Sequence, residues 1–84
     1  MGIQLQVHDA RGETKIVTIC DNLNQIRNMT VMDVKQKIMK VLGINDDFRI
    51  VYRTETLEES SLLMSYGIQH MSTIHLILIL PGGH

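Results

Sequence analysis

Apolar and polar residues alternate from Ile3 to His8, near the start of the chain. This period of two predicts a strand with one buried face. A turn at 9–12 follows, and the β-branched run at 15–20 predicts a second strand. We therefore expect an N-terminal β-hairpin, which leads into a polar, asparagine-rich loop at 21–28.

The spacing of apolar residues changes to that of a helix after this loop. Thr30 is a favourable N-cap, and Asp33 completes the pattern of a capping box. Gly43 is a typical residue at which a helix ends. The apolar residues of the expected inner face are Val31, Val34, Ile38 and either Val41 or Leu42. The lysines expected on the other faces are Lys35, Lys37 and Lys40.

The second half of the chain predicts two further strands with short turns between them. The expected elements are a third strand at 48–52, a polar turn at 53–56, a very short return strand from Leu57, a helical turn at 60–66 that Gly67 ends, and a last strand at 73–80 that Pro81 closes. This order predicts an α+β fold with one mixed sheet and one main helix packed across one face, the β-grasp architecture.

The last strand is apolar on both of its faces. Its inner set is expected to be Ile74, Leu76, Leu78 and Leu80, and its outer set His75, Ile77 and Ile79. The third strand, with Ile50 and Tyr52 inward, adds Val51 to the outer face. A solvated sheet face normally carries polar residues, so an exposed apolar patch beside a histidine indicates a docking surface. The alternative is that a loop, a second copy or another domain covers this face.

Composition limits the classes of protein. A chain of 84 residues with 44% hydrophobic residues is expected to form one globular domain at 1–83, with 81–84 as a flexible tail. A net charge of −1 predicts no nucleic-acid partner, and no apolar run is long enough for a membrane helix. One cysteine and no recognisable signal peptide favour a reducing compartment, the cytoplasm or the nucleus.

Residues with catalytic or metal-binding chemistry are few. Cys20 with His75 could form a nucleophile and base, but a lone cysteine at a strand end is more often a small hydrophobe. The histidines at 8, 70, 75 and 84 have no metal-ligand spacing, so we predict no enzyme, no cofactor and no metal site. Asp47 and Glu59 are expected to be solvated loop charges.

Four segments resemble ubiquitin and its relatives, in the same order and at similar spacing. They are residues 30–44, 48–52, 65–69 and 72–83. The resemblance implies that Val51, His75 and Ile77 belong to a partner-binding patch, with Ala10 in place of the family's larger leucine. It also implies that the Tyr66 hydroxyl ties down a backbone turn.

The resemblance also implies partners and a use for the tail. Gly83, after Gly82, matches the glycine that forms an isopeptide bond with a target lysine. The implied partners are proteins: ubiquitin-like recognition domains, activating and conjugating enzymes, and deconjugating proteases. His84 would be removed before activation, or it is a cloning remnant or the edge of a longer chain. Two glycines after a strand can also be a simple linker.

Departures from the family pattern leave two functions open. Ile79 and Pro81 replace tail arginines, and Ile79 argues against the ubiquitin activating enzyme. Glu55 and His70 replace the best-known chain-forming lysines, while Lys35 matches a poorly exposed one, so ubiquitin-type chains are not expected. The chain is then either a conjugated modifier or a non-conjugated interaction domain of a larger protein. The loop at 21–28 is longer than in ubiquitin.

Overall fold

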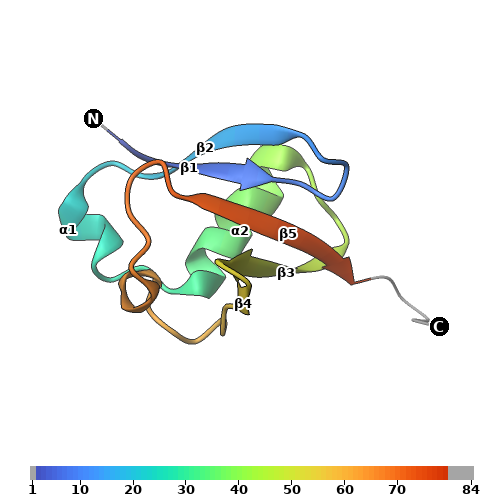
Figure 1. The fold of residues 1–84 in the computed structure, drawn as a ribbon. Coiled ribbons are helices and arrows are strands. Elements are labelled where there is room, and N and C mark those ends of the chain that lie inside the picture. Colours follow the sequence, from blue (N-terminus) through green and yellow to red (C-terminus); the bar gives the residue numbers. More distant parts are fainter. Residues whose placement is uncertain (1, 80–84) are drawn as a thin grey trace.

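The computed structural model describes residues 2–79, which form a five-stranded mixed sheet and one main helix (Figure 1). In chain order the elements are β1 (Ile3–His8), β2 (Thr14–Cys20), α1 (Leu23–Ile26), α2 (Val31–Leu42), β3 (Asp47–Tyr52), β4 (Glu55–Thr56), the 3₁₀ turn η1 (Leu63–Tyr66) and β5 (Thr73–Ile79). The predicted α+β class, with one main helix against a mixed sheet, is confirmed.

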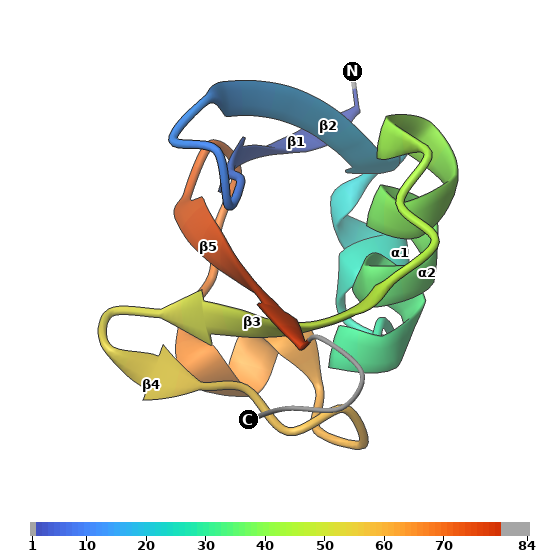
Figure 2. The ribbon, with the colours of Figure 1, turned by 90° about the vertical axis from the view of Figure 1, so that its right-hand side faces the viewer.

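The first and last strands are neighbours in the sheet. The strand order is β2-β1-β5-β3-β4, and β1 pairs with β5 in parallel whereas the other pairs are antiparallel. Figure 2 shows the sheet as a curved layer with both helices on one side of it. The other side of the sheet has no helix over it in this view, so its outer face is where exposed side chains can meet a partner.

Both predicted ends of α2 are confirmed. The N–H of Asp33 donates to Thr30 Oγ1 at 3.2 Å, and the N–H of Thr30 donates to Asp33 Oδ2 at 2.9 Å, which is a complete capping box. Gly43 ends the helix with a left-handed φ of 67°. Of the two candidates for the last inner position, Leu42 packs on the core whereas Val41 is exposed.

Lys35 corrects the expectation that the helix lysines lie away from the core, because only 7% of this residue is exposed. Its ammonium group pairs with Asp47 and Glu59, which are therefore ion-pair partners and not merely solvated loop charges. The pairing explains how a charge can lie at a buried helix position. Lys37 and Lys40 are exposed as expected.

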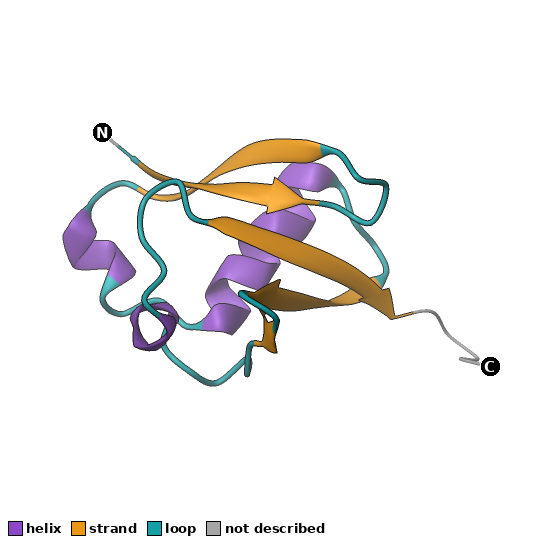
Figure 3. Ribbon diagram, viewed as in Figure 1, coloured by secondary structure: helices purple, strands orange, loops and turns teal. Residues whose placement is uncertain are grey.

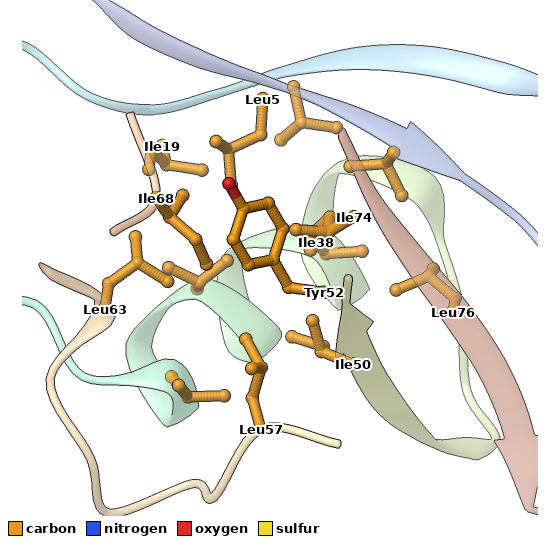
Figure 4. Packing of buried hydrophobic residues seen from close by; sticks show 14 of the residues in the cluster. Leu5, Ile19, Ile38, Ile50, Tyr52, Leu57, Leu63, Ile68, Ile74 and Leu76 are labelled. Carbon is orange, nitrogen blue, oxygen red and sulfur yellow. The ribbon is translucent and has the colours of Figure 1, made fainter. Parts of the chain in front are cut away.

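The core lies between the inner sheet face and α2. Figure 4 shows side chains from strands, helices and loops converging there, with the ring of Tyr52 among Leu5, Ile38 and Ile74. Within residues 2–79, every buried side-chain nitrogen or oxygen has a hydrogen-bond partner. Ile68, in the loop before β5, is fully buried and anchors that loop to the core.

The predicted loop at 21–28 is wrong in part, because it contains the short helix α1 (Figure 3). The N–H of Gln25 donates to Asn22 Oδ1 at 3.0 Å, so Asn22 acts as an N-cap. Ile26 is 1% exposed and anchors this turn in the core. The segment has two apolar residues at a spacing of three, Leu23 and Ile26, which are too few to show a helical period in a polar run, and only Ile26 is buried.

The turn after β3 is shorter than predicted. Arg53 and Thr54 both have positive φ, 51° and 67°, as in the two-residue turns that suit hairpins. The return strand is therefore Glu55–Thr56, and Leu57 is the buried residue after it. The predicted helical turn before Gly67 is confirmed as η1, and the Tyr66 hydroxyl accepts the N–H of Glu58 at 3.0 Å, the role that the resemblance implied.

Leu78 lies on the same strand face as the buried Leu76, as predicted, but it is 37% exposed. The helix ends at Leu42, and the core side of β5 is covered only as far as Leu76. Leu78 instead faces a hollow of about 330 Å³ beside Leu42 and Ile44. Leu80 lies outside the described residues. Over residues 2–79, no helix combines the length and apolar character that a bilayer crossing requires.

Candidate docking surface

We use the name open-face patch for five residues, Ala10, Val51, His75, Ile77 and Ile79. The first four line one shallow depression, together with His8, Asp9 and Arg53 on its edge. The structure thus brings together four residues that the sequence places in three separate segments. Ile79 lies farther along β5, at the end of the described strand.

The strand phase that exposes the patch is confirmed. Ile50 and Tyr52 are buried whereas Val51 between them is half-buried, and Ile77 is 53% exposed although Leu76 beside it is 4% exposed. Such alternation arises because successive side chains of a strand point to opposite faces. Ile77 and Ile79 therefore remain accessible on the outer face of β5.

The register between β3 and β5 decides which side chains flank the patch. Val51 lies opposite His75, but Arg49 lies opposite Ile77 and Asp47 opposite Ile79. The apolar residues of β5 are thus paired with charged residues on β3 and not with further apolar ones. The exposed apolar surface is a narrow stripe along β5, with one basic and one acidic neighbour.

The rim of the depression is held in place by local contacts. The guanidinium of Arg53 stacks over the ring of Tyr52 at 5.2 Å from its centroid. Asp9 accepts the backbone N–H groups of Glu13 and Arg11 at 3.0 and 2.9 Å. The first of these bonds is the largest cause that holds the pKa of the Asp9 carboxyl below its ordinary value. A fixed cation and a fixed anion therefore border the depression.

Two histidines meet at the same depression, a pairing that sequence reasoning missed. His8 lies opposite His75 in the parallel register of β1 and β5, and their ring centroids are 5.1 Å apart in an edge-on arrangement. His8 Nδ1 is also 3.2 Å from Thr14 Oγ1. Both histidines occupy outward positions of the sequence pattern, but only the strand order shows that these positions are adjacent.

Cys20 and His75 lie far apart along the sheet. Cys20 pairs with Ile3 at one end of β1, while His75 pairs with His8 at the other end. Burial raises the pKa of the Cys20 thiol. Among the described residues, no group of three or more His, Cys, Asp or Glu side chains is arranged to hold a metal ion.

The predicted conjugation residues, Gly82 and Gly83, lie outside the described residues, as do Pro81 and His84. No protein-family model matches the chain. Two features of the chain therefore bear on its function: the geometry of the outer sheet face and the sequence of the tail.

Proposed function

We propose that this chain is a β-grasp protein of the ubiquitin-like class, and that it acts by docking the open-face patch on partner proteins. The observation that carries the proposal is the exposure of Ile77 and Ile79, 53% and 37%, along the central strand of a sheet whose exposed face is otherwise largely polar, with Ile16 of β2 as a further exposed apolar residue. A partner that covers about 200–300 Å² of this surface gains several kcal/mol at roughly 25 cal/mol per Å². Association costs consume much of this gain, so the binding is weak and reversible.

The surroundings of the stripe indicate what a partner presents. A small apolar side chain fits the depression that Ala10 leaves open, since alanine fills less of it than a leucine would. Arg49 beside Ile77 favours an acidic group on the partner, whereas the carboxylate of Asp47 beside Ile79 already pairs with Lys35. An acidic group next to an apolar side chain on the partner would therefore set the orientation of the complex.

Charge substitutions on the outer face test the docking proposal. Ile77→Asp and Val51→Asp each place a carboxylate in the depression, and we expect both to abolish capture of partner proteins by the immobilised chain. Thr73→Asp is the matched control, because Thr73 is exposed on the same face at the far end of β5. Capture that survives both patch substitutions, in variants whose unfolding transition is unchanged, would contradict the proposal.

The tail supports a second function, conjugation through Gly83 after removal of His84. The sequence has two consecutive glycines after the last strand, as in the diglycine tail that the resemblance implies, and this favours attachment to target lysines. With a tag at the N-terminus, we expect a ladder of higher-mass species in native cells that disappears in Gly83→Ala. A variant that lacks His84 should keep the ladder, because it already ends at Gly83.

The alternative is a non-conjugated interaction domain of a larger protein. Ile79 and Pro81, which replace the tail arginines of ubiquitin, favour it. Absence of any Gly83-dependent ladder, together with loss of partner capture in Ile77→Asp, would select this alternative. The two experiments therefore separate conjugation from docking.

A further inference from the structure

The pair His8 and His75 places two imidazoles side by side on the outer sheet face. Their centroids are 5.1 Å apart, and the parallel register of β1 and β5 holds the two residues directly opposite each other. His75 is exposed and His8 is half-buried. The sheet therefore fixes the backbones at both residues, while the exposed ring of His75 is free to turn about its side-chain bonds.

The separation of the rings matches the geometry of a shared metal ion. An imidazole centroid lies about 3.2 Å from a bound ion, which is roughly a 2.0 Å metal–nitrogen bond plus ~1.2 Å from the nitrogen to the centroid. With this length on both sides, a centroid separation of 5.1 Å subtends about 105° at the ion. This value is close to the tetrahedral angle that zinc adopts. The rings lie edge-on with an interplanar angle of 63°, so at least one of them must turn about its side-chain bonds before both point a nitrogen at the same ion.

Thr14 supplies the outer contact that a metal-binding histidine needs. Its Oγ1 is 3.2 Å from His8 Nδ1. In the tautomer with its proton on Nδ1, His8 donates to this oxygen and keeps the lone pair of Nε2 for an ion. Histidine ligands generally donate their second ring N–H to an oxygen acceptor, which fixes the tautomer and the ring orientation.

We propose that His8 and His75 form a two-imidazole site for a divalent late transition-metal ion, with Zn²⁺ as the ion that the angle fits best. Imidazole nitrogen is a preferred ligand of such ions. No third His, Cys, Asp or Glu among residues 2–79 completes the coordination, so water or a side chain of a second molecule fills the other positions. The site shares His75 with the open-face patch, so a bound ion lies at the proposed docking surface, next to Val51, which is opposite His75.

Titration of the full chain with Zn²⁺ alone, by calorimetry at pH 7.5, tests the site. We expect one ion per chain, and at least a tenfold loss of affinity in each of His8→Asn and His75→Asn, because each variant leaves a single imidazole. His70→Asn and His84→Asn are the matched controls and should bind like the parent chain. Thr14→Val should weaken binding severalfold, since it removes the acceptor for His8 Nδ1.

Imidazole spectra give a second readout that does not depend on any variant. In ¹H–¹⁵N long-range spectra of the parent chain, Zn²⁺ should shift one ring nitrogen of His8 and one of His75 together, with the same midpoint. Shifts at only one of these rings, or equal losses of affinity in the His70 and His84 controls, would overturn the proposal.

Discussion

Lys35 Nζ lies 2.6 Å from Asp47 Oδ1, although the lysine is almost completely buried. Glu59 Oε1 is 3.1 Å from the same nitrogen, and the ammonium lies 5.4 Å from the centroid of the Phe48 ring. Burial by itself lowers the pKa of Lys35, but the two carboxylates outweigh it and the pKa is raised. One buried cation thus connects α2 to the start of β3 and to the loop before η1.

Removing the cation should cost far less than removing its partners. In Lys35→Met, both carboxylates can still be hydrated because they are largely exposed. The substitution therefore leaves no buried unpaired charge, and we expect a change in unfolding free energy within about 1 kcal/mol. In the double variant Asp47→Asn, Glu59→Gln the ammonium stays buried without an anion, so the chain should be clearly less stable. Urea unfolding measures both, and equal stability of the two variants would contradict this account.

Stability should fall in acid partly through Asp47. The hydrogen bond from Lys35, and next that from the Phe48 N–H, hold the pKa of Asp47 below its ordinary value. A lowered pKa stabilises the folded state above about pH 3.9, the value in unfolded chains, and this contribution is lost as the pH falls through the folded value. Asp9, whose pKa is also lowered, adds to the same window. The raised pKa of Lys35 has the opposite sign, and its contribution is lost only above about pH 10.4.

Urea midpoints between pH 2 and pH 6 test the acid window. Lys35→Met removes the largest cause of the Asp47 shift, so its stability should fall less steeply than that of the parent chain. Asp9→Asn should flatten the curve in the same window, and a variant that combines Lys35→Met with Asp9→Asn should show both effects. An acid slope that neither substitution changes would show that other groups control it.

Truncation of two neighbouring residues of β5 should reduce the unfolding free energy by very different amounts. Leu76 packs in the core, so Leu76→Ala should cost about 2–4 kcal/mol of unfolding free energy. Ile77 faces outward, and Ile77→Ala should change stability by no more than about 0.5 kcal/mol. Chemical denaturation of both variants checks the strand phase, and a larger loss at Ile77 would mean that the phase is inverted.

The capping box of α2 should behave as one unit. Thr30→Ala removes the oxygen that accepts the Asp33 N–H, and we expect a loss of about 1 kcal/mol. Asp33→Ala removes the reciprocal bond to the Thr30 N–H. Because the two bonds support each other, the double variant should lose less than the sum of the single losses. A strictly additive double-mutant cycle in urea would contradict this coupling.

Local patterns predicted most of these elements because they reflect local physics. The alternation in β1 and the outward position of Ile77 follow from the pleat of a strand, and the ends of α2 follow from Thr30 and Gly43. These local patterns failed where contacts with residues distant in the sequence decide whether a side chain is buried. Leu78 is exposed because α2 ends before reaching it, a length that the strand itself does not encode.

The residues of the candidate site also fall into a group that the sequence could predict and a group that it could not. Ala10, Val51 and Ile77 could be assigned to one surface from strand phase and from a resemblance to a family, and the structure brings them to one depression. The contact between His8 and His75 could not be found by spacing, since it requires that the first and last strands pair in parallel. Lys35 was misplaced for a similar reason, because its anions lie on other elements.

The central position of β5 has a consequence for synthesis of the chain. This strand lies between β1 and β3, yet it is the last of the described elements in chain order, so the ribosome makes it after the strands that flank it. Until Thr73–Ile79 has emerged, the nascent chain holds two separate sheet fragments, β2-β1 and β3-β4, whose apolar inner faces share no central strand. The domain must therefore complete its core in one late, non-local step, and a chain that stops before residue 73 would expose those faces to aggregation.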